Sequence, residues 1–150
     1  MDPYKMITSH QGLAVPYATF TGVELIDVTD GVATARMEQR RKTENNVQGQ
    51  HAGAMFTLGE AAAGAAVAGA LAPVILKMRP VAEMAEITYR KFAQGTLTAT
   101  ASMSRDSAEL MAEIEARGET AFDVNIDIRD ASGETVVEMK VNWCVSPTRN

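Results

Sequence analysis

The sequence predicts an α+β fold in which one curved, mainly antiparallel sheet wraps around a long central helix, and three observations lead to this prediction. A nearly uncharged run of Ala, Gly and Met covers residues 45–73 (NNVQGQHAGAMFTLGEAAAGAAVAGALAP), as expected of a buried helix with a small surface. Segments on both sides alternate apolar and polar residues, which is typical of strands with one buried face. Short turn signals between consecutive strands favour antiparallel pairing. One sheet covering one helix is an economical way to bury these surfaces.

Four segments precede the central helix. We expect a short helix or irregular arm at residues 3–12 and a strand at residues 17–28. A second strand is expected at residues 31–40, followed by a polar loop at residues 41–50. Asp30 and Gly31 form a typical hairpin turn between the two strands. In the second strand Ala33, Ala35 and Met37 lie on one side, opposite to its charged residues.

The central helix is predicted from about Gly53 to Leu71, because Ala, Leu, Met and Glu favour helices. Gly59, Gly64 and Gly69 in its interior each cost about 1 kcal/mol of helix stability relative to Ala. A helix tolerates that cost where another part of the protein must approach it closely. Its surface is small nearly all round, so we expect it to be buried nearly all round before Pro73 ends it.

The chain after the central helix is predicted to be mostly strand. We expect strands at residues 84–92, 96–103, 121–130 and 135–145, and one helix at residues 107–118 between the second and third of them. A turn is expected at Gln94 and Gly95. The helix is predicted to be capped at Ser107 and to stop at Gly118. The third of these strands alternates most regularly, and its inward-facing residues are Phe122, Val124, Ile126 and Ile128.

The composition limits both the domain organisation and the function. The 150 residues fit a single domain, 1–150, with 46% hydrophobic and 22% charged residues, as in an ordinary globular protein. The net charge of −5 disfavours nucleic-acid binding, because contacts to phosphates depend on clustered Lys and Arg. The lone cysteine, Cys144, cannot form an internal disulfide, and the N-terminal residues lack the pattern of a signal peptide. We therefore expect a cytoplasmic protein.

The Ala- and Gly-rich run raises the question of a membrane span, which needs about 20 apolar residues. Ala and Gly contribute little to membrane insertion, and Glu60 near the middle of a span would cost about 2.5–3.5 kcal/mol. The amphipathic strands on either side also supply a sheet that can bury the run. These arguments predict that the protein does not associate with membranes.

The order of elements and the stretch HAGAMFTLGEAAAGAA resemble the hotdog fold, and within it the phenylacetate-degradation type of acyl-CoA thioesterases. That family has an Asn-containing loop, a His-Gly-Gly start to the central helix, and an Asp or Glu nine residues after the His. The resemblance covers roughly residues 17–146. The sequence departs from the family pattern at Ala52 and in the short spacing from Gly49 to His51. It also departs in the 107–118 helix, which resembles a branch of the family whose function is not established. The matching residues are Asn45 and Asn46 in the loop, His51, Ala52 and Gly53 at the helix start, and Glu60 at the ninth position.

The resemblance implies a thioester site shared between two subunits. The amides of Ala52 and Gly53 would face the thioester oxygen, and Glu60 of the other subunit would act as general base for water or as nucleophile. Asn45 or Asn46 would orient the water or the carboxylate, and the sequence does not separate the two. The implied assembly is a homodimer or a dimer of dimers, that is, a homotetramer.

Glu60 also stands out on physical grounds. A buried, ionised carboxylate without a partner costs several kcal/mol, or its pKa rises, so a purely structural Glu60 is costly. The alternative is that Glu60 emerges at a dimer seam and pairs with an Arg. His51 either braces the loop through hydrogen bonds, which we favour, or serves as the base. Gly64, one turn beyond Glu60, stands where related enzymes often have Ser or Thr.

The substrate implied by the resemblance is an acyl-CoA, and neither a metal ion nor an organic cofactor is expected. Arg90 and Lys91, which follow a predicted strand, and Arg105 are candidates for binding the phosphates of coenzyme A. The alternative for each of them is a solvated position at a strand edge.

Three functions compete at this stage. Thioester hydrolysis is the leading hypothesis. A hotdog dehydratase acting on 3-hydroxyacyl chains is disfavoured, because its Pro-rich, His-containing loop is absent. A non-catalytic acyl-CoA-binding or sensing dimer is supported by Ala52 and by the missing hydroxyl at Gly64.

Overall fold

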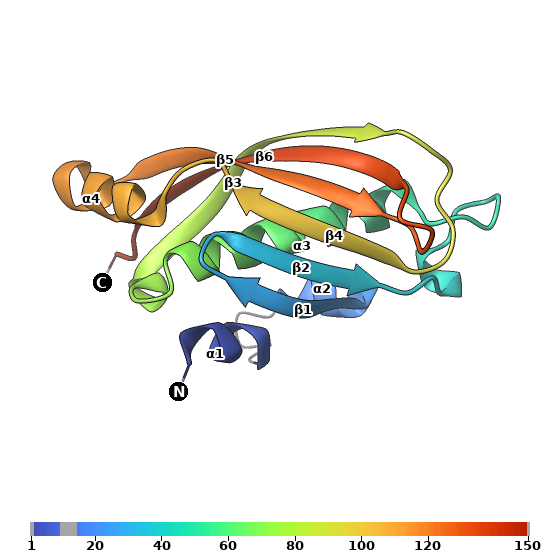
Figure 1. Ribbon diagram of the computed structural model, residues 1–150, viewed down its shortest axis with the longest axis horizontal. Coiled ribbons are helices and arrows are strands. Elements are labelled where there is room, and N and C mark those ends of the chain that lie inside the picture. Colours follow the sequence, from blue (N-terminus) through green and yellow to red (C-terminus); the bar gives the residue numbers. More distant parts are fainter. Residues whose placement is uncertain (1, 10–14, 150) are drawn as a thin grey trace.

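A six-stranded sheet curves around one long helix in the computed structural model, which describes residues 2–9 and 15–149 (Figure 1). The strand order is β1-β2-β4-β5-β6-β3, and every neighbouring pair is antiparallel. The predicted α+β architecture is therefore confirmed. The strands are β1 (Val23–Thr29), β2 (Val32–Met37), β3 (Met78–Tyr89), β4 (Leu97–Met103), β5 (Thr120–Arg129) and β6 (Thr135–Pro147).

The central helix, α3 (Ala52–Ala70), supplies much of the core. Two of its glycines lie where the sheet approaches most closely. A Cβ atom on Gly69 would lie 2.1 Å from the backbone oxygen of Thr29, and one on Gly59 would lie 2.6 Å from the sulfur of Met139. The predicted reason for interior glycines, close approach by another element, is confirmed at these two positions. Among the described residues, no helix is both long and apolar enough to cross a membrane.

The alternation predicted for the strands is also present. Ala33, Ala35 and Met37 of β2 are fully buried, as are the inward-facing residues of β5. These side chains pack on α3 because successive strand residues point to opposite faces of the sheet. The hydrophobic pattern was therefore sufficient to orient β2 and β5.

The prediction of a strand beginning at residue 17 was wrong in its first part. Residues Pro16–Thr21 form a helix, α2, and the strand starts only at Val23. Pro16 at the first helical position and Gly22 at the end, with φ of 89°, set the limits of this helix. Aromatic and β-branched residues between them favour strands locally, but the capping residues and packing on α3 prevail. A second short helix, α1 (Pro3–Ser9), precedes it, and residues 10–12 of the predicted arm lie outside the described part of the chain.

The segment after α3 differs from the prediction in length and pairing. A 3-10 turn (η3, Ile75–Lys77) leads into β3, which starts six residues before the predicted Met84. The turn at Gln94 and Gly95 does not make a hairpin, because β3 pairs with β6 at one edge of the sheet while β4 lies between β2 and β5. The helix α4 (Ser107–Arg117) ends at Gly118 as predicted, but Asp106 rather than Ser107 is its N-cap.

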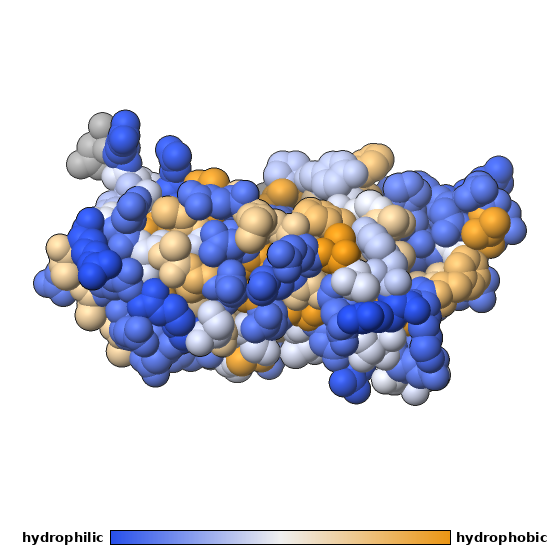
Figure 2. Space-filling model, turned by 90° about the horizontal axis from the view of Figure 1, so that it is seen from above, coloured by the Kyte–Doolittle hydropathy of each residue, from blue (hydrophilic) through white to orange (hydrophobic). Residues whose placement is uncertain are grey.

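β3 differs from the other strands in that none of its residues is fully buried. It lies at the edge of the sheet, and among the described residues only β6 pairs with it. Val81, Met84 and Tyr89 are large apolar side chains on this strand that are 41%, 57% and 43% exposed. Figure 2 looks from above onto the part of the molecule that carries β3 and shows apolar residues among polar ones. An exposed edge with apolar side chains is typical of an interaction surface.

Candidate active site

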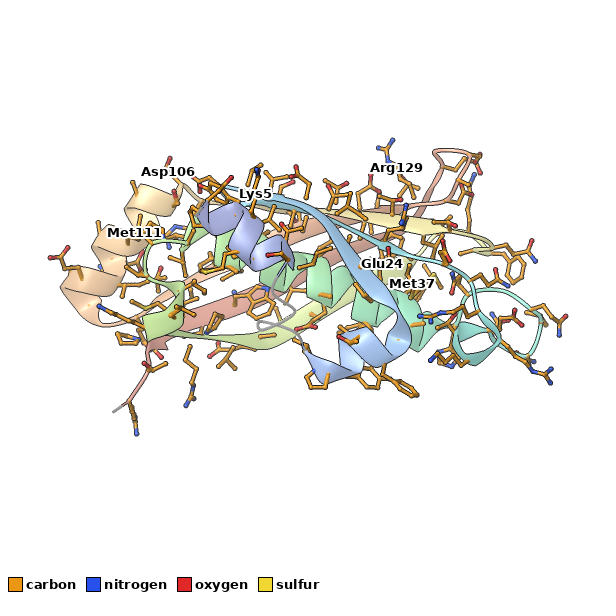
Figure 3. All side chains as sticks on the ribbon, turned by 90° about the horizontal axis from the view of Figure 1, so that it is seen from below. Lys5, Glu24, Met37, Asp106, Met111 and Arg129 are labelled. Atoms are coloured by element: carbon orange, nitrogen blue, oxygen red, sulfur yellow. The ribbon has the colours of Figure 1, made fainter. Side chains whose placement is uncertain are left out.

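Glu60 lies on the face of α3 that the sheet leaves uncovered. A cleft of about 470 Å³ opens there between α1, α2, β1 and α3. Figure 3 looks onto this side of the molecule, with α1, α2 and β1 in front of the central helix and Glu24 on β1. The apolar residues around Glu60 include Ile7, Val15, Leu25, Pro80 and Trp143.

The carboxylate of Glu60 has no hydrogen bond and no ion pair within the described part of the chain. It is half-buried, and this burial raises the pKa of Glu60 above its ordinary value. The other carboxylate in the cleft, Glu24, accepts a hydrogen bond from Arg36 at 3.0 Å and is more exposed. Glu60 is therefore the carboxylate of this cleft that has no partner among the described residues.

The N-terminus of α3 is capped by His51. The backbone N–H of Gly53 donates to Nδ1 of His51 at 2.8 Å, and the backbone N–H of His51 donates to the carbonyl of Thr43 at 2.7 Å. A Cβ atom on Gly53 would lie 3.1 Å from that ring nitrogen, so glycine leaves room for the imidazole. His51 thus stabilises the start of the helix, and in this arrangement the Gly53 N–H already donates its hydrogen bond to Nδ1 of His51.

Ala52, the departure from the His-Gly-Gly pattern, takes up ordinary helical backbone. Gln48 is the one non-glycine residue with positive φ among those described, at 57°. The backbone N–H groups of Ala52 and Ala54 belong to the first helical turn and have no intrahelical partner. A side chain at position 52 therefore does not turn the amide away from the end of the helix.

The two asparagines of the preceding loop have different surroundings. The side-chain oxygen of Asn45 accepts from the N–H groups of Val47 and Gly49, at 3.0 and 2.9 Å, and so shapes the turn. Asn46 is exposed at the tip of that turn. Neither residue lines the cleft of Glu60.

Glu60 and the helix start are well separated along the same helix. Ala52 and Glu60 are eight positions apart, which corresponds to roughly 12 Å along the axis at 1.5 Å per residue. A single thioester group is too small to contact both. The fold brings His51, Ala52 and Gly53 together, but it places Glu60 apart from them.

The cations predicted for the phosphates of coenzyme A are all engaged with carboxylates. Arg90 pairs with Glu138 at 2.6 Å and Lys91 pairs with Glu134 at 3.0 Å. Arg105 binds two carboxylates of α4, and it lies at the opposite end of the sheet from the start of α3 (Figure 1). These pairs leave little free positive charge at the three positions.

A second cleft, of about 210 Å³, lies at the start of α3 and was missed in the sequence. Tyr17 and Phe20 of α2 line it together with Lys42 and His51. Interpreting residues 17–21 as strand concealed this cleft. The cationic run at residues 40–42 was the available signal.

The curved antiparallel sheet around a central helix defines this protein as a hotdog-fold protein, in agreement with the fold that the resemblance implied. The chain belongs to the family described as a domain of unknown function, DUF4442, whose sequence profile matches residues 5–145. No curated protein sequence matches it.

Several solved structures share the fold at low sequence identity. A Pseudomonas aeruginosa protein of unknown function, called a probable thioesterase, has a TM-score of 0.79 and 20% identity, covering 96% of this chain and 95% of that one. A hypothetical thioesterase from Streptococcus pneumoniae, crystallised with coenzyme A, has a TM-score of 0.66 and 19% identity over 90% of this chain and 98% of its own. A mutant of a Staphylococcus aureus thioesterase has a TM-score of 0.69 and 20% identity over 89% and 100%.

Proposed function

We propose that the protein is an acyl-CoA thioesterase and that the carboxylate of Glu60 carries out the reaction. The observation that supports this proposal most strongly is a half-buried carboxylate without a partner, set in an apolar cleft large enough for an acyl group. Burial of an ionised group is unfavourable, so such a residue is typical of a functional site. The similar fold of a protein crystallised with coenzyme A also supports this class of substrate.

Two chemical routes are open to Glu60. As a general base, it takes a proton from water while the water oxygen attacks the thioester carbon; the C–S bond then breaks, and the thiolate of coenzyme A receives the proton. As a nucleophile, a carboxylate oxygen forms a C–O bond to the carbonyl carbon and expels the thiolate, and water then hydrolyses the anhydride. In both routes negative charge develops on the carbonyl oxygen, which backbone N–H donors at the start of α3 would stabilise.

We propose further that the active unit is a homodimer, and that two such dimers can associate as a tetramer. The separation of about 12 Å between Ala52 and Glu60 along one helix makes the site of a lone protomer incomplete. Two antiparallel copies of α3 would bring the start of one helix beside Glu60 of the other. The unpaired edge of β3, with exposed Val81 and Met84, is suited to joining two such protomers. The cytoplasm remains the proposed compartment, since the lone Cys144 thiol fits a reducing environment.

A non-catalytic acyl-CoA-binding or sensing dimer is the second candidate. It is favoured by the hydrogen bond from the Gly53 N–H to His51, which occupies one of the two amides assigned to the thioester oxygen. The absence of a hydroxyl at Gly64 favours it too.

Release of free thiol from a panel of short-chain, long-chain and aryl acyl-CoAs separates the two candidates. We expect the wild-type protein to release coenzyme A from at least one member of the panel with saturation kinetics. Saturable binding of the same compounds without thiol release would identify a binding protein. Absence of both binding and release would rule out acyl-CoA as the ligand.

A further inference from the structure

The cleft at the start of α3 combines two kinds of side chain that recognise nucleotides. Tyr17 and Phe20 of α2 are 64% and 66% exposed, although large aromatic residues are usually buried. Lys42 places its ammonium group 4.9 Å from the centre of the Phe20 ring, a cation–π contact. His51 and Gly53 also line the cleft, and none of the described residues that line it is acidic.

The positive charge of this cleft is not neutralised. Six other cations among the described residues form ion pairs with carboxylates, namely Arg36, Arg90, Lys91, Arg105, Arg129 and Lys140, whereas Lys77 and Arg79 at the start of β3 form none. Arg41 and Lys42 form no such pair within the described part of the chain. The Arg40 guanidinium donates to the carbonyl oxygen of Thr21 at 3.3 Å and ties this loop to the end of α2.

The helix that carries Tyr17 and Phe20 is held in position by its two ends. α2 begins with Pro16 and ends at Gly22, whose φ of 89° suits glycine. A Cβ atom on Gly22 would lie 1.3 Å from a terminal nitrogen of Arg40, so the guanidinium packs directly on this glycine. The loop that carries Arg41 and Lys42 is thereby held against the helix that carries Tyr17 and Phe20. A preformed surface of this kind reduces the entropy lost on ligand binding.

We infer that this cleft binds the nucleotide end of the acyl-CoA substrate, with the purine stacked on Phe20 or Tyr17 and the phosphates paired with Lys42. The inference rests on the proposed function for the identity of the ligand. The cleft shares His51 and Gly53 with the start of α3, so a nucleotide bound there directs the pantetheine arm towards the amides assigned to the thioester oxygen. Arg90 and Lys91, the positions predicted from the sequence, are less suited because Glu138 and Glu134 already neutralise them.

The test compares substrates with and without a nucleotide in Lys42→Ala and Phe20→Ala variants. For an acyl-CoA we expect each substitution to raise KM about tenfold and to leave kcat unchanged, because a stacked base or a paired phosphate is lost. The N-acetylcysteamine thioester of the same acyl group has no nucleotide, and its kinetics should not change. Both side chains are exposed, and unchanged thermal unfolding would confirm that the variants fold.

Binding of adenosine 3′,5′-bisphosphate, measured by calorimetry, makes the test independent of catalysis. Lys77→Ala is the matched control, since Lys77 is an exposed cation at the other end of α3. If the wild-type protein releases no thiol but binds the bisphosphate, and Lys42→Ala weakens that binding about tenfold, the cleft is a nucleotide site although the proposed function fails. Unchanged acyl-CoA kinetics in Lys42→Ala and Phe20→Ala would overturn the inference, as would a rise in KM in Lys91→Ala instead. Thiol release by the wild-type protein would still support a thioesterase in either case.

Discussion

The two faces of α3 are built from the same small residues but have different physical roles. On the face towards the sheet, Gly59 and Gly69 leave no space for a side chain, because Met139 and the backbone of Thr29 fill it. On the face towards the cleft, a Cβ atom on Gly64 would meet only the Trp143 ring among the described residues, at an ordinary 3.5 Å. Small residues thus allow close packing on one face and access on the other.

The largest effect on stability is expected from Gly69→Ala. Its methyl group would lie 2.1 Å from a backbone oxygen that cannot move away without displacing β1. Overpacking of this kind destabilises a protein by about 1–3 kcal/mol or more. Chemical denaturation should show this loss in the free energy of unfolding.

Gly64→Ala on the opposite face is the matched control, and it should raise the free energy of unfolding instead of lowering it. Space is available there, and replacing Gly by Ala inside a helix contributes about 0.5–1 kcal/mol of stability. If both variants lost the same stability, the proposed difference between the two faces would be wrong.

Glu60→Gln should stabilise the protein at pH 7. Burial raises the pKa of Glu60, so ionising this group is harder in the folded than in the unfolded state. The raised pKa lets the folded state hold its proton to a higher pH than the unfolded state, so stability falls as pH rises from the unfolded pKa through the folded one. Gln does not ionise, so the stability of the variant does not fall in this way. The stability difference between Glu60→Gln and wild type should therefore shrink as pH falls towards the ordinary pKa of Glu. Thermal unfolding at pH 4 and pH 7 measures it, and an advantage that grew at low pH would contradict the account.

The smallest effect is expected from Glu24→Gln, in the same cleft. Its ion pair with Arg36 is exposed, and such pairs contribute about 0–1 kcal/mol. Unlike Glu60→Gln, this substitution should lower the unfolding temperature slightly or leave it unchanged at pH 7. A marked stabilisation would show that any carboxylate in the cleft is unfavourable, and that Glu60 is not special.

Periodic patterns predicted the parts of the fold that depend on burial alone. The inward face of β5 followed from the spacing of apolar residues, and the limits of α3 followed from helix propensity and Pro73. The helix α2 did not, because its aromatic and β-branched residues favour a strand and only Pro16 and Gly22 limit it. The pairing of β3 with β6 joins residues far apart in the chain, so local patterns carry no signal for it.

The candidate site was predicted only in part for the same reason. Glu60 and His51 stand out within the Ala- and Gly-rich run, and the capping of α3 by His51 agrees with its position just before the helix. The partners of Arg90 and Lys91 come from the region of β6, more than forty residues later, so their neutralisation was invisible in the sequence. The cleft around Lys42 depended on α2, which local propensity concealed.

The most direct test of the central claim compares kcat for acyl-CoA hydrolysis in Glu60→Gln and Glu24→Gln. Both carboxylates line the same cleft, but Glu24 is paired and Glu60 is not. We expect Glu60→Gln to lower kcat by about 10²- to 10⁴-fold, as the loss of a general base does, and Glu24→Gln to leave it nearly unchanged. Equal activity in wild type and Glu60→Gln would contradict the assignment of the reaction to Glu60.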